Sequence, residues 1–224
     1  MTRTGALSPA VGIAALVAIT AQQTHAAETI DFENTGCRAG SSGFCEIPDS
    51  YADTEEIDVS YASVNILTGA RAEGLYRYGV GYGDLNGVTF GGRNRIDYAS
   101  EIRLEAKSGF VLSLLDFDFA SFANRSPVTP IVISDLAGNI ISEGVRSTGG
   151  STHNNYLVNS AFGSGVVIRW GPDGYEVGLD NIRYTTRELT GAVPEPGTWA
   201  MMIAGFGMVG AGLRRRNRPR FAAA

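Results

Sequence analysis

The sequence is poor in lysine, histidine and cysteine. Only one of its 18 basic residues is a lysine, Lys107, and it has two histidines, His25 and His153. So few histidines exclude a histidine-rich zinc site, and without a Gly-x-Ser-x-Gly motif nothing indicates a Ser/His/Asp triad. We therefore expect His153 to be an exposed loop residue without a catalytic role.

The middle of the chain is also short of positive charge. The formal net charge is −5, but six arginines lie close to the two ends: Arg3, Arg214, Arg215, Arg216, Arg218 and Arg220. Without these six and Glu195, residues 27–193 hold 12 basic and 22 acidic groups, a net charge of −10. An acidic domain of this kind excludes a nucleic-acid binder that works through a basic surface.

The N-terminal segment is typical of a secretory signal peptide. Arg3 supplies a positive charge, and Val11–Ile19 is an apolar run too short to span a bilayer. Thr24 and Ala26 place small residues before a cleavage site, so we predict that residues 1–26 are the signal peptide. The Sec translocon and signal peptidase are then partners. An N-terminal anchor helix is the alternative.

The C-terminal segment, residues 191–224, combines a hinge, an apolar stretch and arginines. Two prolines in Pro194-Glu195-Pro196 predict an extended backbone open to a protease. Residues 197–213 are long enough to cross the hydrocarbon layer as a single transmembrane helix. Stop-transfer arginines would hold the basic tail, residues 214–224, in the cytoplasm; they are Arg214, Arg215 and Arg216.

This order of motifs resembles a known sorting signal. The PEP box at 194–196, the Trp199-Ala200 pair and the glycine-rich apolar stretch resemble the PEP-CTERM signal, in its Trp-Ala variant, of Gram-negative bacteria that make exopolysaccharide. The resemblance implies processing near Pro194–Pro196 by an exosortase, a membrane-embedded cysteine transpeptidase. The precursor would be anchored in the inner membrane and the product would reach the cell surface or the extracellular space. A plain C-terminal tail anchor is the alternative.

Residues 27–190 lack any long stretch with the 3.6-residue period of a helix. Short alternating or apolar runs are separated instead by Gly, Asn, Asp and Ser. These runs predict strands at 28–33, 57–66, 75–82, 87–90, 101–106, 110–119, 129–134, 139–145, 155–160, 165–170 and 177–185. Strands at this spacing predict one all-β domain, an antiparallel β-sandwich or jelly roll.

One predicted strand changes phase in its middle. The apolar residues of the 110–119 run alternate in one phase up to Leu114 and in the opposite phase from Leu115 onward. Such a change predicts a β-bulge or a strand that passes between sheets. Asp116 and Asp118 would then lie on the polar face.

The two cysteines, Cys37 and Cys45, are eight positions apart in a Gly/Ser-rich stretch. In an exported protein such a pair predicts one disulfide that closes a loop and contributes about 2–3 kcal/mol. A catalytic thiol or a metal-binding pair is the alternative, but no histidine lies nearby in the sequence.

Acidic residues in the first and last predicted strands suggest a cation site. Asp180 shares a strand face with Ile182, so it would point into the core and would need a partner. The Asp31–Glu33 run and the segment around Asp180 resemble jelly-roll carbohydrate-binding and galactose-binding-like modules. That resemblance implies a structural Ca²⁺ between the terminal strands, with Glu33 and Asp180 as ligands. A hydrogen-bonded structural aspartate is the alternative.

Three tyrosines amid glycines, Tyr76, Tyr78 and Tyr82, are candidates for a platform that stacks on sugar rings. Tyr156 and Trp170 are further candidates. Tyrosines at a period of two are also ordinary sheet residues.

These features predict a non-catalytic, exosortase-processed protein of the cell surface or extracellular matrix, associated with exopolysaccharide or biofilm. One alternative is a carbohydrate-binding module with a structural calcium. A second is a glycan hydrolase that uses paired carboxylates, which are plentiful in the sequence.

Overall fold

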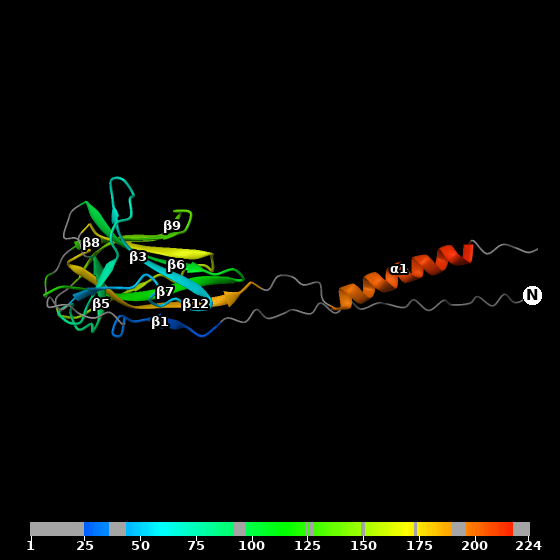
Figure 1. Cartoon of the computed structure of the whole chain (residues 1–224), viewed down its shortest axis with the longest axis horizontal. Helices are drawn as coiled ribbons and strands as arrows, with labels where there is room; N and C mark the ends of the chain where they lie inside the picture. Colours follow the sequence, from blue (N-terminus) through cyan, green and yellow to red (C-terminus); the bar gives the residue numbers. More distant parts are fainter. Residues whose placement is uncertain are drawn as a thin grey trace, which may run out of the picture.

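The computed structural model describes residues 25–35, 44–91, 97–123, 125, 128–148, 151–172, 174–189 and 196–216. Within these ranges, strands form a layered β domain and one helix follows it (Figure 1). The strands are β1 (Glu28–Ile30), β2 (Phe44–Glu46), β3 (Ile57–Asn65), β4 (Leu75–Tyr78), β5 (Val88–Gly91), β6 (Tyr98–Ala106), β7 (Phe110–Ser121), β8 (Val128–Asp135), β9 (Ile140–Ser147), β10 (Asn154–Leu157), β11 (Gly165–Trp170) and β12 (Val177–Glu188). The helix is α1 (Pro196–Arg216).

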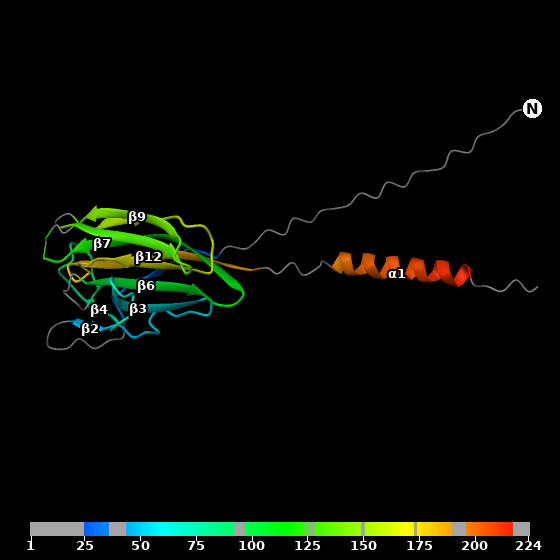
Figure 2. The ribbon, with the colours of Figure 1, turned by 90° about the horizontal axis from the view of Figure 1, so that it is seen from above.

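The strands form two sheets that lie one above the other in Figure 1, and Figure 2 looks onto them from above. Sheet A has the order β10-β7-β12-β5-β4-β2, with β1 also paired to β12, and sheet B has the order β3-β6-β11-β8-β9. The pairings are antiparallel. The prediction of an antiparallel all-β domain is therefore confirmed.

Alternating side chains from both sheets fill one core. Leu112 of β7, Ile102 of β6 and Ile168 of β11 are each fully buried in it. Trp170 is fully buried as well, and its indole N–H donates to the carbonyl of Val177 at 2.9 Å. Burial of these apolar surfaces, rather than local propensity, holds the two sheets together.

Three predicted strands end three or more residues early, and the three-residue strand β2 was not predicted. The 28–33 run ends at Ile30, and the chain turns at Phe32–Asn34. The 75–82 run pairs only as far as Tyr78, because Gly81 and Gly83 adopt φ angles of 99° and 57° that turn the chain away. The 155–160 run ends at Leu157, since the next two backbone N–H groups, of Val158 and Asn159, both donate to the carbonyl of Leu115.

The predicted phase change in the 110–119 run is present. The residues on either side of it, Leu114 and Phe117, are both fully buried although they are three positions apart. The partner strand β12 is irregular at the same level: its register against β7 shifts between Asp180 and Tyr184, and Asn181 adopts a φ of 49°. The irregularity lets Asp180 point inward while Asn181 points outward.

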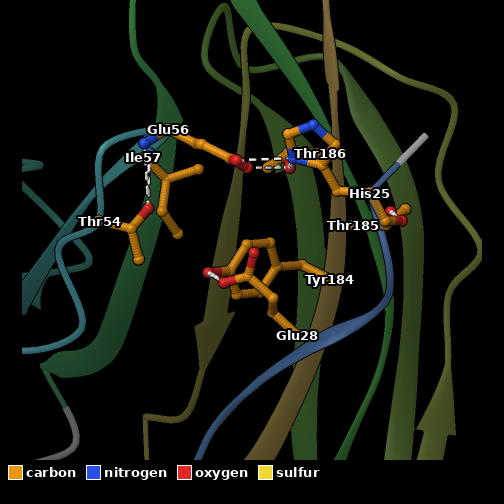
Figure 3. Close-up of polar contacts among 8 residues, drawn as sticks. All are labelled: His25, Glu28, Thr54, Glu56, Ile57, Tyr184, Thr185 and Thr186. Carbon is orange, nitrogen blue, oxygen red and sulfur yellow. Dashed lines mark hydrogen bonds and ion pairs between the residues drawn. The ribbon is translucent and has the colours of Figure 1, made fainter. Parts of the chain in front are cut away.

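The first described residues join the sandwich through a small polar cluster, shown in Figure 3. The backbone N–H of His25 donates to the carbonyl of Thr186 at 3.0 Å, and its Nδ1 lies 2.6 Å from Oε1 of Glu56. Beside it, the Tyr184 hydroxyl donates to Glu28 at 2.7 Å, and burial raises the pKa of that hydroxyl. The predicted cleavage after Ala26 would remove His25 from this cluster; residues 1–24 of the predicted signal peptide lie outside the described residues.

Helix α1 covers the predicted 197–213 segment and extends it at both ends. Pro196 opens the helix instead of excluding it, because the first helical position requires no backbone N–H donor. Within the described part of the chain, no helix has both the length and the apolar character required to cross a membrane. The predicted transmembrane span is therefore not confirmed. Its five glycines, Gly197, Gly205, Gly207, Gly210 and Gly212, dilute the apolar character of α1.

Cys45 lies in β2 and is not a free thiol. Its predicted partner, Cys37, lies outside the described residues. The Cys37–Cys45 disulfide therefore stays a prediction.

Candidate functional site

A polar hollow of about 510 Å³ opens on the outer face of sheet A. Its lining comes from strands β1, β7, β10 and β12 and from the loop before β10: Thr29, Asp118, His153, Asn155, Asn181 and Arg183. We call this hollow the polar pocket. Its floor exists because outward residues of β7, β10 and β12 alternate with buried ones such as Phe117, Tyr156 and Ile182.

Hydrogen bonds join four side chains of the polar pocket and the neighbouring Asp116 in one network. The amide of Asn155 donates to Asp116 at 3.0 Å and to Asp118 at 2.9 Å, so one side chain bridges two carboxylates. The amide of Asn181 donates to the second oxygen of Asp118 at 3.0 Å. Nε of Arg183 donates to Asp116 at 2.7 Å, and the hydrogen bond raises the pKa of the guanidinium. The network holds these groups in place before any ligand arrives.

His153 stands at the rim of the polar pocket and is oriented by Asp84. Its Nδ1 lies 2.8 Å from Oδ1 of Asp84, and its backbone N–H donates to the same oxygen at 2.6 Å. The hydrogen bond from His153 holds the pKa of the Asp84 carboxyl below its usual range. The exposed loop position expected for His153 is confirmed. Its imidazole also lines the polar pocket. Nothing in the sequence indicated its contact with Asp84, which is 69 positions away.

The chemistry of the polar pocket suits an uncharged polyol. Amide, carboxylate, imidazole and guanidinium groups offer both donors and acceptors to hydroxyl groups, and a few convergent polar groups are what fixes the orientation of a small ligand. Asp116 and Asp118, expected on the polar face, are both in the network. The sequence did not show that Asn155, Asn181 and Arg183 would join them.

Asp180 is a buried structural carboxylate. Its side chain points inward as expected, with 3% of the residue exposed, and its Oδ1 accepts the backbone N–H of Phe32 at 3.2 Å. Burial raises the pKa of Asp180 to about 7, although hydrogen bonds from the backbone of Asn181 and Phe32 oppose that shift. The hydrogen-bonded aspartate that the sequence allowed is the arrangement found.

The predicted calcium ligands, Glu33 and Asp180, each have other contacts in the structure. Glu33 lies in the turn after β1, and its Oε1 contacts the amide of Asn86 at 3.4 Å. The backbone carbonyls of Phe32 and Glu33 are occupied by the guanidinium of Arg77, at 2.8 Å each, so an arginine already supplies a cation there. Among the residues that the structure covers, no group of three or more His, Cys, Asp or Glu is arranged to hold a metal ion. The structure therefore gives the predicted calcium site no support.

The candidate sugar-stacking tyrosines belong to a second hydrophobic cluster on sheet A. Tyr82 is 2% exposed and its hydroxyl donates to the carbonyl of Tyr175 at 2.7 Å, so it cannot present a ring face to a ligand. Tyr76 and Tyr78 are half-buried, and the ring of Tyr78 packs edge-on against Tyr82 at 6.4 Å. The cluster encloses a cavity of about 90 Å³ lined by Phe44, Tyr78, Tyr82, Phe90, Phe122 and Tyr175.

Two further aromatic candidates are core residues. Tyr156 stacks on Phe117 at 5.2 Å and is 3% exposed, and Trp170 is fully buried. Tight packing of neighbouring rings, which the strand pattern alone does not reveal, takes these two side chains and Tyr82 away from any ligand. A role for Tyr76 and Tyr78 in sugar binding stays a prediction.

The residues of the predicted sorting signal lie at α1 and just before it. Pro194 and Glu195 fall outside the described residues, and Pro196, Trp199, Ala200 and the three predicted stop-transfer arginines, Arg214 to Arg216, lie within the helix. Apolar side chains along α1 are exposed, including Ile203 and Phe206. An apolar helix with this exposure is unlike the amphipathic helices that pack on a protein core.

Three solved structures match parts of the chain. The CBM22-1 xylan-binding domain from Paenibacillus barcinonensis Xyn10C is 11% identical, and the match covers 78% of this chain and 100% of that chain with a TM-score of 0.30. A GH26-CBM35 β-(1,4)-mannanase from Podospora anserina is 11% identical, and the match covers 75% of this chain and 29% of that chain with a TM-score of 0.30. TmCBM61 in complex with β-1,4-galactotriose is 11% identical, and the match covers 71% of this chain and 94% of that chain with a TM-score of 0.23. This chain thus spans 29% of the mannanase. The neighbours include carbohydrate-binding modules, but TM-scores this low carry no argument about this chain.

No curated protein matches the sequence. A family model does match its C-terminal part, at residues 192–216, and the match ends at the residue where α1 ends. It includes the PEP box, the Trp-Ala pair, the glycine-rich helix and the first arginines, which are the features that the sequence pattern had singled out. The chain carries a PEP-CTERM protein-sorting motif at residues 192–216.

Proposed function

We propose that this protein is exported, is cleaved by an exosortase at its PEP-CTERM motif, and acts at the cell surface as a non-catalytic polysaccharide-binding protein. The motif implies export and processing. The polar pocket is the observation that carries the binding role. Exopolysaccharide of the surrounding matrix is the ligand that we infer for it.

Preorganisation of the polar pocket supports binding. Each carboxylate oxygen of Asp118 accepts a hydrogen bond from an amide, one from Asn155 and the other from Asn181. Neither amide side chain therefore has to be ordered when a sugar binds. Binding then loses less conformational entropy than it would with free side chains. The volume of about 510 Å³ lies within the range of ordinary small-ligand sites.

The same network supports a role without catalysis. A glycosidase requires one protonated carboxyl as general acid and one free carboxylate. Here Asp116 accepts a hydrogen bond from the guanidinium of Arg183, and Asp118 accepts hydrogen bonds from two amides. Both carboxyl groups therefore act as hydrogen-bond acceptors within the protein.

Replacing Asn155 by alanine should weaken retention of the full-length chain on the immobilised exopolysaccharide of its host by at least about tenfold, since each 1.4 kcal/mol of lost binding is a factor of ten. The measurement is affinity electrophoresis or column retention. Asn86→Ala is the matched control, because Asn86 is an exposed asparagine whose side-chain contact to Glu33 is long, at 3.4 Å.

Loss of retention on changing Tyr76 and Tyr78, with Asn155→Ala unaffected, would move the site to the aromatic cluster and contradict the proposal. Turnover of a glycan that Asp118→Asn abolishes would contradict the non-catalytic role.

Mass analysis of the protein from its host should find a chain that ends near Pro194–Pro196, because the motif directs cleavage there. Replacement of Glu195 by alanine should leave the tail with its arginines attached. A wild-type chain that keeps the intact tail would show a simple anchor and contradict exosortase processing.

A further inference from the structure

A buried glutamate on sheet B is surrounded by three arginines. Glu101 of β6 points to the outer face of the sheet, because its neighbours Ser100 and Ile102 are buried on the other side, yet only 1% of it is exposed. Arg169 of β11 donates to its Oε2 through two nitrogens, at 2.5 and 3.2 Å. Arg71, which bridges to Val64 beside β3, donates to Oε1 at 2.5 Å. Two guanidinium groups therefore satisfy both oxygens of Glu101.

The third arginine is left almost without a partner. Arg103, two residues further along β6, approaches Glu101 only to 3.7 Å, and its buried Nε has no hydrogen-bond partner in the described structure. A buried donor without a partner costs free energy. The Arg103 side chain as a whole is 35% exposed, so the rest of its guanidinium is open to a ligand. Three guanidinium groups around one carboxylate also leave two positive charges uncompensated within the cluster.

A hollow of about 200 Å³ lies beside Arg103 and Arg169. Arg103, Arg169 and Ser134 supply its polar wall, and Val132 and Val167 supply an apolar one. Asp135 also lines it, but both of its carboxylate oxygens are engaged in the turn with Asn139. Planar guanidinium groups next to an apolar wall suit a carboxylate attached to a ring.

The surroundings favour an anion with one charge. Glu105 lies two residues after Arg103, on the same face of β6. Across the sheet, Val132 of β8 pairs with Arg169 on one side and with Glu143 of β9 on the other. Both glutamates are exposed. These acids and the acidic domain as a whole repel a dianion more than a monoanion. A carboxylate therefore fits this hollow better than a phosphate does.

We propose that the hollow between Arg103 and Arg169 binds the carboxylate of an acidic saccharide, such as a uronic acid unit. The inference rests on the proposed polysaccharide-binding role, but it concerns the other sheet of the sandwich and other residues. The polar pocket would hold sugar hydroxyls, and the arginine hollow would select chains that carry carboxylates.

The test is calorimetric titration of the full-length chain with a galacturonic acid trisaccharide and, separately, with a neutral galactose trisaccharide. Replacement of Arg103 by glutamine should weaken binding of the acidic sugar at least tenfold. Arg125→Gln removes an exposed arginine that is paired with Glu176 and should have no effect. Arg103→Lys keeps the positive charge but lacks the planar guanidinium group, and it should bind the acidic sugar with intermediate affinity.

Each outcome of the titration decides between the two sites. If Arg103→Gln binds the acidic sugar as tightly as the wild type, or if the neutral sugar binds equally well and with the same dependence on Arg103, the inference is wrong. Inorganic phosphate that binds more tightly than the trisaccharide, and depends on Arg103, would overturn the choice of a carboxylate. The Asn155→Ala variant should lose retention on polysaccharide but should still bind the acidic trisaccharide in a way that depends on Arg103. The two sites can therefore fail independently, and the experiment distinguishes the two failures. A thermal melt of each variant shows whether it is folded.

Discussion

Replacing Asp180 by asparagine should stabilise the protein at pH 8 and leave its stability at pH 4 almost unchanged. The wild-type carboxyl is buried where β12 meets the chain after β1, and burial raises its pKa from 3.8 to about 7. Nearby Asp31 and Asp118 add to that shift by charge repulsion. Asparagine keeps an oxygen that accepts the N–H of Phe32, and it carries no charge.

The sign of the pH dependence follows from the raised pKa. Below pH 4 the carboxyl is protonated in both the folded and the unfolded state and contributes nothing. Between pH 4 and pH 7 the unfolded chain releases the proton while the folded chain keeps it, so the free energy of unfolding falls as the pH rises. Above pH 7 both states are ionised and the loss is complete. A shift of this size corresponds to about 4 kcal/mol as an order of magnitude.

Chemical or thermal unfolding of both proteins from pH 4 to pH 8 measures the effect. The wild type should lose stability across this window relative to Asp180→Asn, and Asp49→Asn, which changes an exposed aspartate, should follow the wild type. If the difference between Asp180→Asn and the wild type is the same at pH 4 and pH 8, the pKa of Asp180 is not raised and the argument fails.

Replacing Glu101 by glutamine should lower the free energy of unfolding by about 2–4 kcal/mol. Removing one partner of a buried ion pair leaves the charge of the other partners uncompensated. Arg71 and Arg169 form ion pairs with the Glu101 carboxylate at 2.5 Å, and Arg103 lies 3.7 Å from it. Their side chains are 35–45% exposed, so water relieves part of the cost and the effect falls below that of a fully buried pair.

Glu105→Gln is the matched control, because Glu105 lies on the same strand and face but is exposed. It should change the free energy of unfolding by less than about 0.5 kcal/mol. Denaturant unfolding at neutral pH compares the two variants. Equal stabilities would show that the arginines are adequately solvated without Glu101, and would weaken the case for uncompensated charge beside the hollow.

Local sequence patterns were sufficient for most of the sandwich. Alternation of apolar residues marked the long strands, because a strand with one buried face must alternate. The phase change after Leu114 predicted the irregularity that the register of β7 and β12 shows. Strand β2 was missed because three residues, Phe44–Glu46, are too few to establish a period.

The candidate sites were less accessible from the sequence. Asp116 and Asp118 were placed on a polar face, but the pairing of β10 with β7 brings Asn155 between them, and the irregular backbone at Asn181 turns that amide outward. Tyr82 looked like its neighbours Tyr76 and Tyr78 in the sequence, and only the packing of Phe90 and Phe122 around it shows that it is buried. The Glu33–Asp180 calcium site gains no support from the structure, and the backbone carbonyls of Phe32 and Glu33 accept instead from Arg77, which is distant in the sequence.

The sequence by itself determined the motif that sorts this protein and the two-sheet character of its domain, because both depend on residues close together along the chain. Only the tertiary structure decided which charged groups meet. His153 reaches Asp84, and Glu101 gathers Arg71, Arg103 and Arg169, across separations that the chain closes only when the sheets form. The physical reason is that periodicity fixes which face a side chain takes, whereas the register of distant strands fixes its neighbours.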